Sequence, residues 1–167
     1  MSAAFKAMQF ARRVHAEQVR KYTGNPYADH LAEVAGIVAT VAVRNDVWPE
    51  HMIATAWLHD CVEDCGVTKG ELLIEFDAVI TSGVLLLSDL EQGNRAERKA
   101  ASRARLAEAP GWVQTIKCAD MISNTSSIVK HDPKFAVAYL EEKRLLLDVL
   151  IRADSRLLAM ARAQVTA

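Results

Sequence analysis

The sequence predicts an all-α protein of seven to eight or more helices. Ala, Leu, Glu, Lys and Arg dominate the chain, and all five are good helix formers. Glycine and proline, which interrupt helices, occur only 7 and 4 times in 167 residues. No segment alternates apolar and polar residues regularly, as a half-buried strand does.

The length and composition favour a single domain. A chain of 167 residues is typical of one domain, and 51% apolar residues are enough to build a core without disulfides. We therefore expect residues 1–167 to form one helical bundle.

Five helices are expected in the first half of the chain. Their approximate spans are residues 3–19, residues 28–43, residues 49–64, a short helix after Thr68, and residues 78–88. Apolar residues at helical spacing predict the buried face of the first helix: Phe5, Met8, Ala11 and Val14. Turn-forming residues separate these helices at positions 22–26 and 45–49, and Gly66 provides a C-terminal stop. Thr68 and Glu71 have the spacing of a capping box.

Three further helices are expected in the second half. A strongly charged helix covers about residues 95–107 and is closed by Pro110 and Gly111. The next helix covers about residues 112–128, and a last long helix starts after Pro133 and runs to the C-terminus. We also consider a homodimer formed through the exposed apolar part of this last helix.

The charge balance excludes a strongly basic surface that binds nucleic acid nonspecifically, because the chain has 20 basic and 21 acidic residues and a formal net charge of −1. The N-terminus has no signal pattern, and no apolar run approaches the roughly 20 residues needed to cross a bilayer. We therefore expect a cytoplasmic protein that binds neither a nucleic acid polymer nor a membrane.

The three cysteines do not form a disulfide framework, since their number is odd and they are sparse. Cys61 and Cys65 would lie one helical turn apart, but such a pair alone is a poor zinc pattern. We interpret Cys61, Cys65 and Cys118 as small, semi-buried apolar residues, with a redox role as the alternative.

Titratable residues share one stripe of the helix expected at residues 49–64. His59 and Asp60 are adjacent, and Glu63 and Asp64 follow one turn later on an otherwise apolar helix. A buried helix that carries such groups on one face needs compensation, and a divalent cation is the natural one.

A similar pattern occurs at Lys117, Asp120 and Asn124, on the helix expected at residues 112–128. The Asp120 carboxylate needs a partner among its apolar neighbours. A metal ion shared with His59 and Asp60 would supply one, and an ion pair with Lys117 is the alternative. Each motif alone is weak evidence, as is a lone His30, but their joint occurrence favours a metal site.

These motifs resemble those of the HD superfamily of metal-dependent phosphohydrolases. The resemblance is closer to the hydrolase domain of RelA/SpoT proteins and to the stand-alone small alarmone hydrolases. The matching elements are the basic pair Arg20 and Lys21, G-x-P-Y-x-x-H at residues 24–30, H-D-x-x-E-D at residues 59–64, and K-x-A-D-x-x-x-N at residues 117–124. The resemblance covers nearly the whole chain.

The resemblance implies an HD-type helical bundle with a manganese ion. The implied metal ligands are His30, His59, Asp60 and Asp120. The implied activity is that of a guanosine-3′,5′-bis(diphosphate) 3′-diphosphatase-like enzyme, which removes 3′-pyrophosphate from (p)ppGpp-like alarmone nucleotides by attack of a metal-bound water. Glu63 and Asp64, one turn beyond the ligands, would order this water and shuttle a proton.

The substrate implied by the resemblance is a phosphorylated nucleotide. Arg20 and Lys21 would neutralise phosphate charge, and Lys117 belongs to the same substrate site. Asn124 and Tyr139 would contact the nucleoside. Arg98 and Lys99, in the charged helix, would either extend the phosphate contacts or form a solvated face, and the two interpretations have equal weight.

Two other functions stay open. The sequence departs from the family pattern at Met121 and at residues 125–127, around Asn124. This difference motivates an HD-type phosphatase acting on another phosphorylated nucleotide, as a nucleotidase or a nicotinamide cofactor phosphatase. A non-catalytic nucleotide-binding HD module is the other alternative, and the complete ligand set with Glu63 and Asp64 argues against it.

Overall fold

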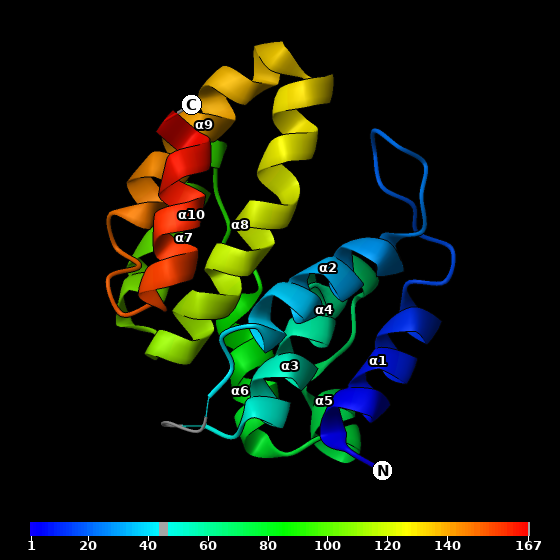
Figure 1. The fold of residues 1–167 in the computed structure, drawn as a ribbon. Coiled ribbons are helices and arrows are strands. Elements are labelled where there is room, and N and C mark those ends of the chain that lie inside the picture. The colour runs from blue at the N-terminus through cyan, green and yellow to red at the C-terminus, as the bar shows by residue number, and fades with distance from the viewer. Residues whose placement is uncertain (44–46, 167) are drawn as a thin grey trace. The chain divides into compact units, whose positions relative to one another are not determined.

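The computed structural model describes residues 1–43 and 47–166 and confirms the all-α prediction (Figure 1). Within these residues there are ten α-helices and no β-strand, only an isolated antiparallel bridge between Val19 and Pro26. The predicted helix break at Asn45 and Asp46 lies outside the described residues. No helix in the described ranges is long and apolar enough to cross a membrane.

The chain divides into two compact units, Met1–Leu90 and Glu91–Ala167, called here the first and the second unit. The first unit contains α1 (Ala3–Val14), α2 (Tyr27–Ala39), α3 (Pro49–Leu58), α4 (Cys61–Cys65), α5 (Lys69–Glu75) and α6 (Ala78–Leu87). The second unit contains α7 (Arg95–Glu108), α8 (Gly111–His131), α9 (Pro133–Leu147) and α10 (Ser155–Thr166). That the whole chain acts as one domain stays a prediction.

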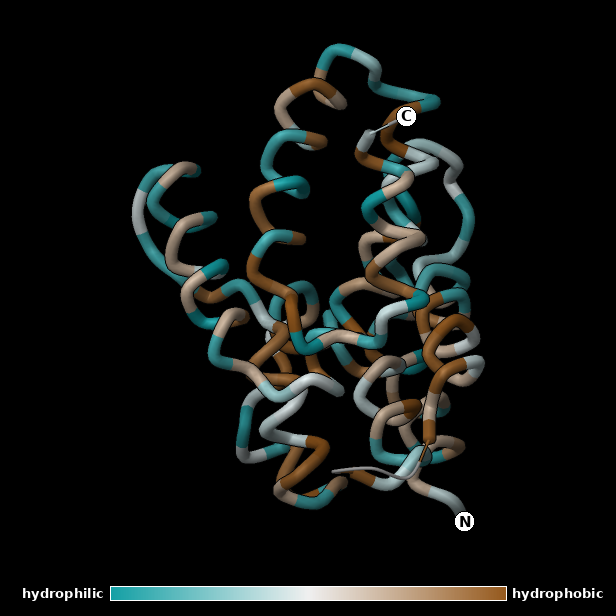
Figure 2. Tube along the Cα trace, turned by 60° about the vertical axis from the view of Figure 1, so that its left-hand side comes forward, coloured by the Kyte–Doolittle hydropathy of each residue, from teal (hydrophilic) through white to brown (hydrophobic). Residues whose placement is uncertain are grey.

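In the first unit, α3 packs against α1, α2 and α6 and is buried along most of its length. Apolar and polar residues succeed one another along the helices, brown and teal in Figure 2. The predicted buried face of α1 was partly wrong: Phe5 is exposed, whereas Ala7, Phe10 and Ala11 are buried. The cause is tertiary, because Phe10 packs edge-on against Phe76, with ring centroids 5.5 Å apart.

The first helix is shorter than predicted, ending at Val14 instead of residue 19. The following loop has its own hydrogen bonds: the Arg20 amide donates to the Asn25 carbonyl (2.8 Å), and the Gly24 amide donates to the Arg20 carbonyl (3.0 Å). Gly24 has a φ of +72°, which glycine adopts without strain. This loop contains Arg20 and leads into α2. That helix also ends earlier than predicted, at Ala39.

The helix expected at residues 49–64 is broken into α3 and α4 at His59 and Asp60, so the prediction of one continuous helix was wrong. Asp60 has φ −102° and ψ −4°, outside the range of a regular helix. The stop at Gly66, with φ +66°, and the capping box at Thr68 are confirmed. The break places the two chemically important residues at a corner between two helices.

In the second unit, α8 packs against α9 and α10. The prediction of one last long helix was wrong, because the chain forms α9 and α10 with a turn between them. Side chains of α8 hydrogen-bond to the backbone of this turn. The buried Gln114 accepts a hydrogen bond from the Arg152 amide (2.8 Å), and Thr115 Oγ1 accepts one from the Asp154 amide (2.9 Å). The Asp154 carboxylate then accepts from the Leu157 amide at the start of α10 (3.4 Å).

Candidate metal centre

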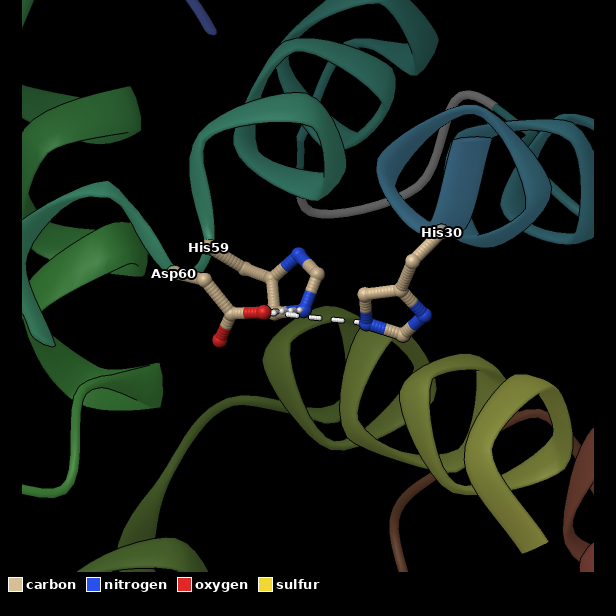
Figure 3. A group of neighbouring side chains, drawn as sticks. All are labelled: His30, His59 and Asp60. Atoms are coloured by element: carbon tan, nitrogen blue, oxygen red, sulfur yellow. Dashed lines mark ion pairs between the residues drawn. The ribbon is translucent and has the colours of Figure 1, made fainter. Parts of the chain in front are cut away.

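Three predicted metal ligands meet in the first unit (Figure 3). His30 lies on α2, His59 at the C-terminal end of α3 and Asp60 at the start of α4. One ligand atom of each lies within 4.8 Å of the others. His30 and His59 are buried, with 0% and 2% exposure, and the Asp60 side chain is 18% exposed. The sequence pattern had indicated these residues, and the fold brings them together.

The hydrogen bonding of His59 shows what this group requires. His59 Nδ1 lies 2.8 Å from the Ala56 carbonyl oxygen, which can only accept, so Nδ1 carries the hydrogen. In the neutral ring, Nε2 then presents a lone pair to Asp60 Oδ2, 2.9 Å away. Two facing acceptors require a cation, which is either a proton on the ring or a metal ion.

The donor set fits a metal ion. His30 Nε2 lies 3.6 Å from the same oxygen of Asp60, so two imidazole nitrogens and a carboxylate converge. Imidazole and carboxylate together suit divalent transition metals. The Ala56 carbonyl fixes the ring of His59 through its second nitrogen, as is usual for a histidine that binds metal.

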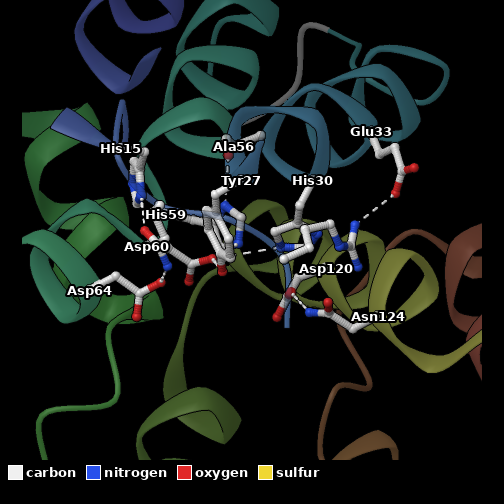
Figure 4. A network of polar contacts seen from close by, with 12 residues as sticks. His15, Tyr27, His30, Glu33, Ala56, His59, Asp60, Asp64, Asp120 and Asn124 are labelled. Carbon is white, nitrogen blue, oxygen red and sulfur yellow. Dashed lines mark hydrogen bonds and ion pairs between the residues drawn. The ribbon is translucent and has the colours of Figure 1, made fainter. Parts of the chain in front are cut away.

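The two histidines of this group belong to a row of aromatic rings in contact with one another (Figure 4). His15 stacks on Tyr27, with centroids 5.1 Å apart and planes 19° apart. Tyr27 contacts His30 edge-on at 5.4 Å, and His30 contacts His59 edge-on at 5.3 Å. The Tyr27 hydroxyl donates a hydrogen bond to Asp60 Oδ2 (2.7 Å). The ligand side chains are therefore fixed by packing as well as by polar contacts.

The two predicted catalytic carboxylates lie on α4 and are exposed. Glu63 Oε2 accepts a hydrogen bond from the Asp89 amide (2.9 Å), and Asp64 Oδ2 accepts one from Gln18 Nε2 (2.8 Å). Both carboxylates are thus oriented and reachable by water, as proton transfer requires.

The cysteines agree with their interpretation as small, semi-buried residues. All three are free thiols. Burial raises the pKa of Cys61 and of Cys118 to about 12. Cys65 is half-buried, and burial followed by the charges of Asp64 and Asp60 raises its pKa as well. At neutral pH the thiols therefore remain protonated and weakly nucleophilic.

The predicted phosphate-binding pair lies in the loop that precedes α2, in the same unit as the three ligands. Arg20 Nη1 lies 3.4 Å from Glu33 Oε2, a loose ion pair. Lys21 is exposed, and its ammonium lies 5.0 Å from the centroid of the Tyr22 ring. Both side chains carry positive charge into the loop before α2, and the Arg20 side chain is the more buried of the two.

In the second unit, three predicted residues of α8 form a local cluster. Lys117 Nζ donates to Asp120 Oδ2 (2.9 Å), and Asn124 Nδ2 donates to Asp120 Oδ1 (2.7 Å). The ion pair between Lys117 and Asp120, offered as an alternative by the sequence, is therefore present. Figure 4 shows the Asn124 contact.

The remaining predicted substrate residues also lie in the second unit. Tyr139 is buried, its hydroxyl lies 3.3 Å from Thr125 Oγ1, and burial raises its pKa to about 12. Arg98 is exposed and donates to the Gly93 carbonyl (2.7 Å), while Lys99 is half-buried on the same helix.

Sequence reasoning assigned no role to Tyr27 or Gln18. Tyr27 precedes His30 by three residues on α2, and this spacing was a usable signal. Gln18 gave no such signal, because its contact with Asp64 joins residues 46 positions apart.

The chain has clear relatives. Residues 7–140 match the family described as HD domain. Guanosine-3′,5′-bis(diphosphate) 3′-pyrophosphohydrolase MESH1 of Homo sapiens is 29% identical over 130 residues, which are 77% of this chain and 71% of that protein. A probable guanosine-3′,5′-bis(diphosphate) 3′-pyrophosphohydrolase of Synechocystis sp. is 32% identical over 135 residues. That match covers 77% of this chain but only 17% of the much longer relative.

A solved structure supports the same fold. It is described as a metazoan ortholog of SpoT that hydrolyses ppGpp, and it superimposes with a TM-score of 0.86. The match covers 98% of this chain and 94% of that one, at 22% sequence identity. At this identity the likeness shows a shared fold.

Proposed function

Since this chain belongs to the HD domain family, we propose that it is a metal-dependent phosphohydrolase that removes 3′-pyrophosphate from (p)ppGpp-like alarmone nucleotides. The observation that carries the proposal is the convergence of two buried imidazoles, His30 and His59, on the partly exposed Asp60 carboxylate, whose facing acceptor atoms require a cation. The substrate class is supported by the relatives, two of which are named for this activity.

We assign manganese as the metal and Asp120 as its fourth ligand. Two imidazoles and two carboxylates form a suitable donor set for such an ion. The contacts of Asp120 with Lys117 and Asn124 hold both of its carboxylate oxygens in place on α8. When bound, the metal would lower the pKa of a coordinated water and polarise the phosphoryl oxygen.

The residues of this chain perform the remaining steps of the proposed reaction. A water oxygen attacks the 3′-linked phosphorus, and the bond from that phosphorus to the ribose 3′ oxygen breaks. Glu63 or Asp64 accepts a proton from the water, and the 3′ oxygen gains one as pyrophosphate leaves. Gln18 keeps the Asp64 carboxylate in one orientation for this transfer.

Substrate binding is proposed for seven residues. The group is Arg20, Lys21, Arg98, Lys99, Lys117, Asn124 and Tyr139. The cations would contact phosphate oxygens, and Asn124 and Tyr139 would contact the nucleoside. Since the HD domain match runs from residue 7 to residue 140, and so includes residues of both units, we propose that the chain acts as one domain. A cytoplasmic location and a homodimer also remain proposals.

The test is pyrophosphate release from ppGpp and ppApp with Mn²⁺. We expect release by the wild type and a loss of at least about 1,000-fold in Asp60→Ala. Asp29→Ala is the matched control, since Asp29 is an exposed residue of the first turn of α2, and it should behave as wild type. Failure of the manganese-loaded wild type to cleave either nucleotide would refute the alarmone assignment.

A second candidate is a phosphatase acting on another phosphorylated nucleotide. It is favoured by Thr125, which stands in a segment that departs from the family pattern and whose Oγ1 lies 3.3 Å from the hydroxyl of Tyr139, a proposed nucleoside contact. A phosphate-release screen over nucleotides, including 2′- and 3′-phosphorylated nicotinamide cofactors, separates the two functions.

A further inference from the structure

We infer that Tyr27 is a positioning residue of the metal centre, because its hydroxyl holds the Asp60 carboxylate in the orientation that binds a cation beside His30 and His59. This inference rests on the metal site proposed above and adds to it a residue that is not a ligand. It is drawn from three features of the first unit: the fixed position of Tyr27, its ring contacts, and the lack of a capping bond at Asp60.

The backbone at Tyr27 is fixed before the helix begins. Pro26 is the N-cap of α2 and forms a bridge with Val19, and the Tyr27 amide donates to the Gln18 carbonyl (2.9 Å). Tyr27 is the first residue of α2, three positions before His30, so both side chains leave the same side of the helix. The loop and the first turn of α2 together fix the backbone position from which the phenol of Tyr27 extends.

The ring of Tyr27 is fixed on both sides. His15 stacks on it, and the His30 ring meets it at an interplanar angle of 62°. His15 is itself buried, and its Nδ1 contacts Gln18 Oε1 (2.5 Å). With the ring held in this way, the hydroxyl reaches Asp60, 33 residues later in the chain, at 2.7 Å.

Asp60 needs such outside support. It occupies the N-cap of α4, where an aspartate commonly accepts a hydrogen bond from the helix, but its side chain makes no capping bond. The helix has five residues and does not itself fix the carboxylate through a cap. Oδ2 has two lone pairs, so it can accept from the phenol with one and bind a cation with the other.

Loss of the hydroxyl should therefore weaken metal binding while leaving the packing intact. Removing a hydrogen bond to a metal ligand typically lowers metal affinity about 10- to 100-fold. Tyr27→Phe removes only the hydroxyl and keeps both ring contacts. Tyr22→Phe makes the same change in the turn before α2, where the ring contacts the Lys21 ammonium, and serves as the matched control.

The experiment is titration of the metal-free full chain with Mn²⁺ alone, following the free ion by its electron paramagnetic resonance signal. We expect the Kd of Tyr27→Phe to rise about 10- to 100-fold, and that of Tyr22→Phe to match wild type. The melting temperature of metal-free Tyr27→Phe should stay close to that of wild type. A purely structural tyrosine would show the opposite result, with a lower melting temperature and unchanged Mn²⁺ affinity.

The outcomes separate this inference from the proposed function. Wild-type affinity in Tyr27→Phe would overturn the role of Tyr27 and leave the metal site standing. A wild type that binds no Mn²⁺, while remaining folded, would overturn the metal site and the inference together.

Discussion

The polar contacts of the candidate site residues differ in range between the two units. In the first unit, Tyr27 and Asp60 meet across 33 residues of sequence. In the second unit, Asp120 is held by Lys117 and Asn124, which lie three and four positions away on α8. The second cluster needs only that α8 is helical, whereas the first exists only when separate helices assemble. The candidate metal centre should therefore depend on the tertiary structure, and on its cation, more strongly than the α8 cluster does.

The largest effect should follow the loss of a ligand in the first unit. His59→Ala removes one of the three metal ligands that meet in the first unit. We therefore expect Mn²⁺ binding to become undetectable and activity to fall at least about 1,000-fold. Calorimetric Mn²⁺ titration and pyrophosphate release measure the two effects. His131→Ala, at the end of α8, is the control and should retain both. Wild-type Mn²⁺ affinity in His59→Ala would contradict the assignment.

Asp120→Asn tests whether the α8 cluster contributes to the same chemistry. If Asp120 is the fourth ligand, as we propose, the Kd for Mn²⁺ should rise about 10- to 100-fold, less than for His59→Ala. If Asp120 only pairs with Lys117, Mn²⁺ affinity should stay the same and only the melting temperature should fall. Calorimetry and thermal unfolding of the same preparation distinguish the two outcomes.

Metal removal should affect the first unit most. Saturation at 100 times the Kd stabilises a protein by about 2.7 kcal/mol, which corresponds to a rise in melting temperature of about 5–10 °C for a chain of this size. A chelator should reverse the rise. Hydrogen exchange should then quicken in α2 and around Asp60, and stay unchanged in α10. Equal loss of protection in α10 would show that the metal's effect is not confined to the ligand-bearing helices.

The smallest effect on stability should come from an exposed ion pair in the second unit, between two residues that are far apart in sequence. Arg95 forms two hydrogen bonds with Glu142 (2.6 and 2.8 Å), and these lower the pKa of Glu142, against the opposing effect of burial. Because the folded pKa is below the unfolded one, the stabilisation is present above about pH 4.3 and is lost as the pH falls through the folded pKa. The Arg95 side chain is 49% exposed, so Glu142→Gln should cost less than about 1 kcal/mol.

Urea unfolding at pH 7 and pH 3 measures this difference, which should disappear at the lower pH. Glu141→Gln is the control, since Glu141 pairs with Arg144 within α9 and should change stability less. A difference between Glu142→Gln and wild type that persists at pH 3 would show that packing, rather than the ion pair, is responsible.

Much of the fold could be predicted, because helix formers and breakers act locally. The capping box at Thr68 and the stop at Gly66 were read directly from the sequence. The division of the last helix was not, because it depends on Gln114 accepting a hydrogen bond from the Arg152 amide, 38 residues later. A contact of that sequence separation leaves no periodic trace in the chain.

For the site, the sequence by itself determined the chemistry: two histidines, four carboxylates and a basic pair at spacings that suit helices. Only the tertiary structure decided that α3 ends at Leu58, just before His59, that Asp60 turns toward the two imidazoles, and that Tyr27 supports it. The physical reason is the range of the interactions. Propensity and capping act within about four residues, whereas the orientation of a ligand is set by packing and hydrogen bonds between helices that are distant in sequence.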